Sequence, residues 1–494
     1  MDFVTPRSRY RRPASDIPAT VRVAIVLALP MVGAIGVGGI YLNKELLVAA
    51  AWIALGLGAV VLARPLVGIG IMTSMFMLAA YPTLLADLGF LTINNLIGAC
   101  LAIVLLAQIT AARDFSMFKP LPIVMLTGIG IILVIATAHS SIAFPTLRVS
   151  QGTGSLGHDL DKTSDMMHDF WARLIFLLLF FAFVRDGRDT RAIFYVFVLS
   201  LFLAVPSALV NWWNGELSHG FRTEASVTAG SNPNRLAMIC LMEITCWWCW
   251  ALTRRGAARI LTALGVIGGA LLVILASGSR SGLLGTAVLG VLIQTGPRRY
   301  RLSVPQMGLI FAAGVIMVVA LVPPEAWQRS LNYNTEDTHA GSTMSIEARE
   351  QTIETAVHMV HDHYLLGIGL GNFREVSRQI YSDPWFRPPH NSYVWAVSEG
   401  GIFVLAGYLY LFLRLWLDLL ACHRLVARDP ECLWVVVSLR NVFYVYCFFA
   451  IFADLWLNPI TYVVFGTIIC MRRYLESLSP AATARLAPAL ARAA

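Results

Sequence analysis

Long apolar runs with almost no charge recur from residue 20 to residue 472, and they restrict the fold more than any other feature of the chain. A run of about 17–25 apolar residues is long enough to cross the hydrocarbon core of a membrane as a helix. We therefore predict an all-α polytopic membrane protein with about fourteen transmembrane helices (12–14). The predicted spans are residues 20–41, 46–63, 66–85, 94–110, 121–138, 170–184, 192–213, 235–253, 259–276, 282–296, 304–323, 392–417, 434–455 and 460–472.

The composition agrees with a membrane protein. The chain is 57% hydrophobic and only 13% charged, whereas a soluble domain carries about 25% charged residues. Its net charge of +8 does not point to nucleic acid, because many of the basic residues stand in short loops beside apolar runs, where they set membrane topology. Membrane lipids are therefore expected around the protein, and nucleic acid is not an expected partner.

Clusters of basic residues predict the orientation of the spans. Positive residues collect in cytoplasmic loops, and here the clusters alternate with loops that lack them. Both termini are thus expected in the cytoplasm, and the basic N-terminus is interpreted as a tail rather than a cleaved signal peptide. The predicted cytoplasmic clusters are Arg185–Arg191, Arg254–Arg259, Arg298–Arg301, His423–Arg428 and Arg472–Arg473. The predicted organisation begins with a cytoplasmic basic tail (1–19) and transmembrane helices (20–323), which enclose outer loops 139–169 and 214–234 and an outer turn 277–281. A large outer helical loop (324–391), C-terminal transmembrane helices (392–472) and a cytoplasmic tail (473–494) follow.

The first polar feature on the predicted outer face is the turn Ser277–Gly282, which carries Arg280 between two apolar helices. An arginine here could simply extend to lipid headgroups. Alternatively, a guanidinium beside a helix N-terminus and small Ser and Gly residues suits the oxygens of a phosphate.

The second feature is Phe221–Glu224 followed by Gly230–Ala237. Its Asn-Pro-Asn segment is a turn that begins the next helix. Arg222 and Arg235 add positive charge on the same side, and Arg222 is the better ligand candidate because Arg235 could pair with Glu224.

The third feature is Arg387–Tyr393, in which two prolines precede His390, Asn391 and an apolar helix. The prolines stiffen the approach and would fix His390 at a helix start near the membrane surface. A lone histidine there is more often a polar cap than a base, but the outward arginines favour a base that accepts a proton at neutral pH.

The longest outer loop contains a predicted helix. Ile346, Ile353, Ala356 and Val360 repeat at helical spacing, and Arg349 shares their stripe. The glycines of 367–371 then end the helix and permit an irregular turn.

Together these segments resemble the O-antigen ligase/polymerase family. The resemblance rests on four motifs in family order between about 222 and 405, which cover under half of the chain. The motifs are Arg222 with Gly230–Ala237, the Ser-x-Ser-Arg-x-Gly turn at 277–282, Asp362–Phe373, and Pro389–Tyr393 followed by Glu399–Gly401.

The resemblance implies a GT-C-like glycosyltransferase of the bacterial inner membrane that acts, without a metal or other cofactor, on undecaprenyl-diphosphate-linked glycans at the periplasmic face. Carried onto this sequence, it implies that Arg222 and Arg280 bind the diphosphate and that His390 activates the acceptor hydroxyl. Arg349 matches a family arginine in the loop helix, and Arg235, Asn391 and Arg173 are supporting candidates. The chemistry is coherent, because a base makes the hydroxyl a nucleophile while arginines stabilise the departing diphosphate. Direct displacement predicts inversion of the anomeric centre.

The acceptor remains open at this stage. A polymerase joins lipid-linked repeat units, a ligase transfers the finished glycan to lipid A core, and an oligosaccharyltransferase-like member modifies protein. We favour the polymerase, for O-antigen or exopolysaccharide, because about fourteen spans and a long outer loop fit it best. An alternative from another class is a lipid-linked-glycan flippase, although such transporters usually show repeated halves and charge at the midplane.

Two further patterns could hold a metal ion. Asp159 and Asp161, with His158 and Asp165 nearby, resemble a carboxylate pair for a metal-bound diphosphate. His361 and His363 could also bind a metal, but two residues apart on a helix they diverge. The eight cysteines indicate neither a disulfide framework nor a zinc site.

Three charged positions in or beside apolar helices were also candidates. Arg414 and Asp418 are four residues apart and are expected to pair. Asp454, near the outer end of its predicted helix, is a potential partner for an outer arginine.

Overall fold

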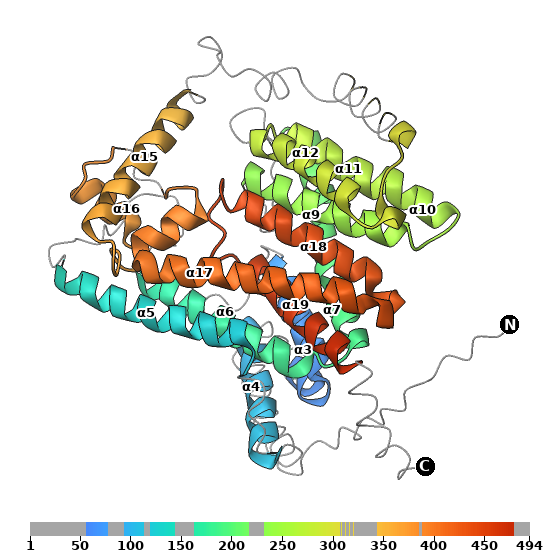
Figure 1. Cartoon of the computed structure of the whole chain (residues 1–494), viewed down its shortest axis with the longest axis horizontal. Helices are drawn as coiled ribbons and strands as arrows, with labels where there is room; N and C mark the ends of the chain where they lie inside the picture. Colours follow the sequence, from blue (N-terminus) through green and yellow to red (C-terminus); the bar gives the residue numbers. More distant parts are fainter. Residues whose placement is uncertain are drawn as a thin grey trace, which may run out of the picture. The chain divides into compact units, whose positions relative to one another are not determined.

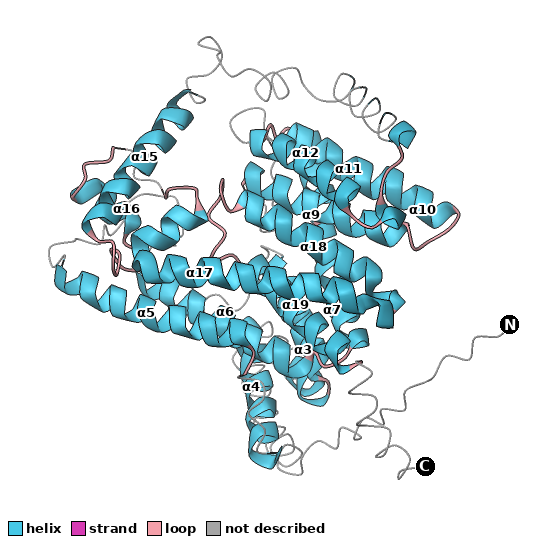
Figure 2. Cartoon of the chain, in the orientation of Figure 1, coloured by secondary structure: helices cyan, strands magenta, loops and turns pink. Residues whose placement is uncertain are grey.

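The computed structural model describes residues 56–77, 93–112, 119–143, 163–216, 232–306, 343–384 and 388–478, together with isolated positions between 308 and 320. Within these residues every regular element is a helix and no strand occurs (Figure 2). Figure 1 shows the helices of these residues and labels most of them. They are α3 (Pro65–Met77), α4 (Ile93–Ala112), α5 (Leu121–Ala143), α6 (Thr163–Phe183), α7 (Gly187–Phe202), α8 (Ala204–Trp213), α9 (Pro233–Ala251), α10 (Ala257–Leu261), the π-helix η3 (Thr262–Ile267), α11 (Gly268–Ala276), α12 (Arg280–Thr295), η4 (Arg298–Tyr300), α15 (Thr343–Asp362), α16 (Phe373–Gln379), α17 (Ser392–Leu425), η5 (Val426–Arg428), η6 (Pro430–Cys432), α18 (Leu433–Phe449) and α19 (Pro459–Ser477).

The chain divides into two compact units. The first consists of residues 1–72 and 81–115, and α4 belongs to it. The second consists of residues 73–80 and 116–494 and holds every helix from α5 onward. All of the candidate site residues belong to the second unit.

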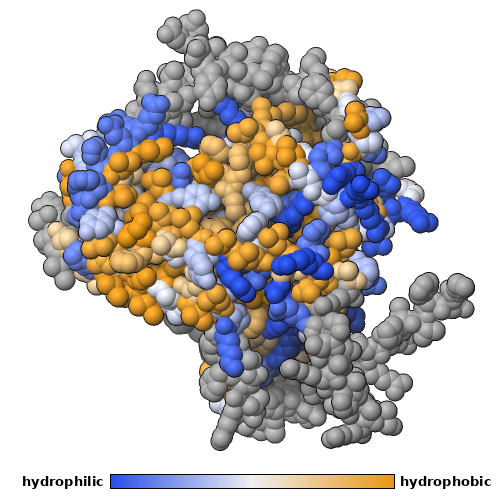
Figure 3. All heavy atoms as spheres, in the orientation of Figure 1, coloured by the Kyte–Doolittle hydropathy of each residue, from blue (hydrophilic) through white to orange (hydrophobic). Residues whose placement is uncertain are grey.

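The prediction of a helical membrane protein is confirmed. Five helical stretches in the described residues are long and apolar enough to cross a membrane. They are Leu121–Ser140, Met166–Phe183, Gly187–Trp213, Ser392–Leu425 and Pro430–Phe449. Apolar side chains such as Val124 and Ile131 of α5 and Phe403 of α17 are about half exposed, as expected of residues that face lipid. Figure 3 shows such side chains over much of the visible face, including the area of α5 and α17.

The count of about fourteen spans stays a prediction. The predicted span 20–41 lies outside the described residues, and only isolated positions of 304–323 are described beyond residue 306. Three further apolar helices, Pro65–Met77, Asn95–Thr110 and Gly265–Ala276, are shorter than a full span.

Helix α18 lies at the centre of the second unit. It packs against α9, α12, α17 and α19, while α17 packs against α5 and α19 against α6 and α7. Its buried side chains include Val435, Leu439, Val442 and Phe449. The residues before and after α18 therefore stand at opposite ends of a predicted membrane span.

Two helix boundaries differ from the sequence prediction in ways that matter for the site. Helix α6 begins at Thr163, inside the predicted outer loop 139–169. Helix α18 ends at Phe449 instead of continuing to 455, so Asp454 lies in the connection to α19 and not on a helix. The connection forms because Asn458 caps α19 by accepting a hydrogen bond from the Ile460 amide at 3.0 Å, and Pro459 follows at the first helical position.

Helix α17 is interrupted at Gly401, whose φ of +72° favours glycine. The glycine-rich turn at 367–371 fits into this kink. The amides of Ile368 and Gly369 donate to the carbonyls of Ser398 and Glu399, both at 2.9 Å. A Cβ at Gly401 would lie 2.1 Å from the Leu365 carbonyl oxygen. The glycine-rich turn at 367–371 and the kink at Gly401 are thus in close backbone contact with each other.

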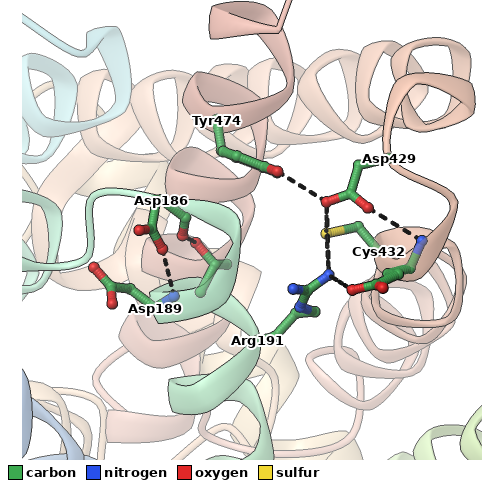
Figure 4. Close-up of polar contacts among 8 residues, drawn as sticks. Asp186, Asp189, Arg191, Asp429, Cys432 and Tyr474 are labelled. Atoms are coloured by element: carbon green, nitrogen blue, oxygen red, sulfur yellow. Dashed lines mark hydrogen bonds and ion pairs between the residues drawn. The ribbon is translucent and has the colours of Figure 1, made fainter. Parts of the chain in front are cut away.

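A polar cluster joins helix ends before α18 (Figure 4), and we call it the Arg191 cluster. Arg191 of α7 pairs with Glu431 at 2.9 Å, and its guanidinium lies 3.6 Å from Asp429. The hydroxyl of Tyr474 on α19 and the thiol of Cys432 both donate to Asp429 Oδ2, at 2.9 and 3.2 Å. The cluster ties α7 and α19 to the segment that leads into α18.

Candidate functional site

The beginnings of α9 and α12 are joined by small polar side chains. Asn232 caps α9 by accepting from the Asn234 amide at 2.9 Å, and Pro233 occupies the first helical position. The predicted role of Asn-Pro-Asn as a helix start is therefore confirmed. Ser279 caps α12 by accepting from the Gly282 amide at 3.1 Å, and its hydroxyl donates to Asn234 Oδ1 at 2.7 Å.

This junction fixes the position of Arg280. The arginine is the first residue of α12 and is half-buried. Two residues later Gly282 permits a close helix crossing, since a Cβ there would lie 2.7 Å from the Ala237 Cβ. Arg280 consequently stands at the positive end of a helix dipole and beside several hydroxyl and amide groups, which favours an anion.

His390 occupies a strained position immediately before α17. Its φ is +48°, a region that non-glycine residues seldom adopt. Asn391 caps α17 by accepting from the amides of Tyr393 and Val394, at 3.0 and 3.1 Å. Backbone strain at a defined residue is typical of functional sites, where the surrounding structure enforces it.

The connection between α18 and α19 holds the imidazole. His390 Nδ1 lies 3.0 Å from Asp454 Oδ2, and the side chains of the two residues are 33% and 11% exposed. Ser392 locks α17 to the same connection, because its hydroxyl donates to the Ala453 carbonyl at 2.7 Å and accepts from the Leu455 amide at 2.8 Å.

The connection is itself braced from the bundle core. Leu455 offers its carbonyl to the hydroxyls of Tyr446 and Thr461, at 3.2 and 2.9 Å. Tyr446 also contacts Tyr408 of α17 through a hydroxyl–hydroxyl bond of 3.0 Å. The buried side chains of Tyr446 and Thr461 thus hold the segment that carries Asp454, and Tyr408 supports Tyr446.

Arg235 links the beginning of α9 to the connection between α18 and α19. It lies three residues after the Asn232 cap, and its guanidinium donates to the backbone carbonyl of Asp454 at 3.4 Å. Asp454 thus contacts an outer arginine, as the sequence suggested, but through its backbone, and its carboxylate serves His390. We call the group of His390, Asp454, Arg235, Asn234, Ser279 and Arg280 the His390 cluster.

This arrangement has the parts of a base and an anion site. A carboxylate accepts from Nδ1–H of a histidine, which leaves Nε2 as the proton acceptor. No hydrogen-bond partner of Nε2 occurs among the described residues, and the imidazole is one-third exposed. A group that needs deprotonation could therefore reach Nε2 while an anionic leaving group contacts the arginines.

Of the remaining predicted site residues, the structure describes Arg173 and Arg349. Arg222 lies outside the described residues, as does Glu224. Arg173 pairs with Asp169, one turn earlier on α6. Arg349 is exposed on α15. The expected pair of Arg414 and Asp418 is confirmed at 3.1 Å.

The described residues hold no group of three or more His, Cys, Asp or Glu side chains that could bind a metal ion. Asp159 and Asp161 are outside this part of the chain. His361 and the hydroxyl of Tyr381 hydrogen-bond to Asp362, at 3.0 and 2.8 Å, and lower the pKa of its carboxyl. Burial lowers the pKa of His363, which stands apart from His361.

Sequence reasoning missed the residues that position His390. Asp454 was noted only as a possible arginine partner, and Ser392 and Asn234 were not singled out. The signals were weak, since a lone carboxylate after an apolar helix and a serine in a helix cap are common. Their importance comes from contacts across 45 to 64 residues of sequence.

A comparison with protein families identifies the region that carries these features. Residues 264–409 match a family model described as O-antigen ligase. The matched stretch contains Arg280, α15, the glycine-rich turn and His390, whereas Arg235 and Asp454 lie outside it. No curated protein matches the chain. The matched stretch is under a third of the chain, and it supports assignment to the O-antigen ligase/polymerase family, whose members transfer glycosyl groups.

Proposed function

We propose that this protein polymerises polysaccharide repeat units carried on undecaprenyl diphosphate, at the periplasmic side of the bacterial inner membrane. The observation that carries the proposal is the His390–Asp454 hydrogen bond of 3.0 Å, together with the Arg235 guanidinium on the Asp454 backbone carbonyl. One group of side chains thereby offers both a base for an acceptor hydroxyl and positive charge for a diphosphate. The family assignment supplies lipid-linked glycans as the substrate class.

In the proposed reaction, His390 Nε2 takes the proton of an acceptor sugar hydroxyl while its oxygen attacks the anomeric carbon of the donor. The bond between that carbon and the diphosphate oxygen breaks, and the electron pair leaves with undecaprenyl diphosphate. Arg280 stabilises the departing charge, and Arg222 is assigned the same role from the family motif. Attack opposite the leaving group inverts the anomeric centre, and no metal is needed.

Asp454 positions the base in this scheme. Its carboxylate keeps the hydrogen on Nδ1 and stabilises the imidazolium that forms when Nε2 accepts a proton. Arg235 contributes by holding the backbone of Asp454 and by adding positive charge at the beginning of α9.

The decisive experiment supplies purified protein with lipid-linked repeat units extracted from its host, in the presence of a chelator. A ladder of lengthened lipid-linked glycans with inverted linkages is expected. Transfer only to added lipid A core would replace the polymerase by a ligase. Movement of the glycan across vesicles without any new glycosidic bond would overturn glycosyl transfer and favour a flippase.

A further inference from the structure

Helix α15 has two apolar faces, and among the described residues only one of them packs on the protein. Ala356 and Met359 are fully buried and form a small core with Ile368, Phe373 and Val376. Ile353 and Val357 point elsewhere and are 41% and 60% exposed. Water disfavours such a surface, so the second face needs a partner.

The exposed apolar residues form a stripe along the helix. Val357 and Val360 follow Ile353 by four and seven residues, the spacing that places side chains on one helix face. Glu354 and His358 are also exposed, but they follow Ile353 by one and five residues and therefore lie on a different side of the helix. The helix thus presents an apolar stripe beside a polar surface.

The stripe continues into the lipid-facing surface of α17. Tyr364 and Leu365, which follow α15, are 58% and 47% exposed. The amide of Ile402 donates to the Tyr364 carbonyl at 2.8 Å. Ile402 and Phe403 in turn begin the exposed apolar side of a helix that is long enough to span the membrane. The kink at Gly401 therefore brings the end of the α15 stripe beside the start of the α17 lipid face.

We propose that α15 lies in the interface of the bilayer, with Ile353, Val357 and Tyr364 in the boundary between headgroups and acyl chains. Amphipathic helices with a narrow apolar stripe and a polar opposite face occupy this position. Tyrosine is enriched at the same depth, because its ring is apolar and its hydroxyl is polar. The bilayer is favoured over a protein partner because the stripe is continuous with the exposed apolar side of α17, a helix long and apolar enough to span the membrane. This inference does not depend on glycosyl transfer.

The test measures which solvent surrounds the stripe in the full-length protein. The variants Val357→Cys and His358→Cys are labelled with the fluorophore NBD and reconstituted in nanodiscs of phosphatidylethanolamine and phosphatidylglycerol. Background labelling is low, because seven of the eight native cysteines are buried and Cys447 is half-buried. Fluorescence is then quenched either by brominated lipid or by aqueous iodide.

Brominated lipid is expected to quench the probe at position 357 at least about twofold more than the probe at 358, and iodide should show the reverse order. Equal quenching by iodide at both positions would place the stripe in water and overturn the proposal. Protection of position 357 from both quenchers would also overturn it, because a second copy or another protein would then cover the stripe.

A second matched pair, Ile353→Cys and Glu354→Cys, repeats the measurement one turn earlier. All four positions are exposed, so the substitutions leave the packed face of α15 intact. Thermal unfolding of each labelled variant checks that the protein remains folded.

Discussion

The His390 and Arg191 clusters lie at opposite ends of α18, and each joins residues from several helices. In the Arg191 cluster the charged groups satisfy one another. Asp429 Oδ2 accepts from Tyr474 and Cys432, its Oδ1 accepts from the Glu431 amide, and the arginine lies between two carboxylates. In the His390 cluster the Asp454 carboxylate contacts His390, Arg235 contacts the Asp454 backbone, and the histidine has a strained backbone and no Nε2 partner among the described residues.

The difference suggests how to separate a structural polar cluster from a chemical one. Groups that neutralise one another hold helices together but have little capacity left for a ligand. A histidine oriented by a carboxylate, with arginines on the neighbouring helix starts, suits an acceptor hydroxyl and an anionic leaving group. The following variants test whether the two ends of α18 differ in this way.

His390→Ala is expected to have the largest effect on transfer, a loss of about 10²- to 10⁴-fold in kcat, because a general base contributes this much. The imidazole is one-third exposed, so the fold should survive. Initial rates of product formation and circular dichroism measure the two properties. Full turnover by His390→Ala would remove the proposed base.

Arg280→Ala should lower kcat by about 10²- to 10³-fold, since it removes a preorganised group that stabilises the departing charge. Arg280→Lys should recover part of the rate, because lysine keeps the charge but not the planar pair of donors. The matched control is Arg254→Ala, an exposed arginine after the other end of α9 that stacks on Trp250. Equal losses in the Arg280→Ala and Arg254→Ala variants would contradict the assignment.

Asp454→Asn should reduce kcat by about 10- to 100-fold with little change in KM, because an amide no longer fixes the hydrogen on Nδ1 of His390. The informative measurement is the double variant with His390→Ala. If Asp454 acts through the histidine, the double variant is as slow as His390→Ala alone. Additive losses would show that Asp454 has an independent role.

Arg191→Met should have the smallest effect on chemistry, with unchanged kcat per folded molecule. It should instead destabilise the protein by about 1–2 kcal/mol, since it removes a half-buried ion pair and leaves Asp429 with fewer partners. Thermal unfolding in detergent measures this change, and Tyr474→Phe should act in the same direction. A fall in kcat of Arg191→Met without a fall in stability would contradict the purely structural role assigned to the Arg191 cluster.

Much of the helical fold could be predicted, because an apolar run of sufficient length has few alternatives to a membrane helix. The bounds of α4, α9 and α19 agree with the predicted spans 94–110, 235–253 and 460–472 to within a few residues. The end of α18 was placed too late, because residues 450–455 are almost as apolar as the helix before them. Their departure from the helix depends on hydrogen bonds to Ser392 of α17 and Thr461 of α19, which lie in other parts of the fold.

The residue types of the site could be predicted from the sequence, but their arrangement in space could be predicted only in part. Arg280 and His390 were recognised from short motifs beside apolar helices. The hydrogen bond between His390 and Asp454 joins two different connections, so no local pattern encodes it. A pair of Arg235 with Glu224 was one possibility, and Glu224 lies outside the described residues. The guanidinium of Arg235 also donates to a backbone carbonyl, an acceptor that every residue provides and that a sequence cannot distinguish.

The kink at Gly401 and the hydrogen bonds of Ser392 have a consequence for the order of biosynthesis. A ribosome delivers the chain from its N-terminus, so the glycine-rich turn is made before its partner in α17, and Arg235 is made before Asp454. The hydrogen bond of His390 forms only after Asp454 has been synthesised. The bond of the Ser392 hydroxyl likewise needs Leu455, whose amide donates to it. A nascent chain that stops before this point contains every motif of the family match yet has no oriented base. The proposed base is therefore oriented only after α18 and the connection that follows it have been synthesised.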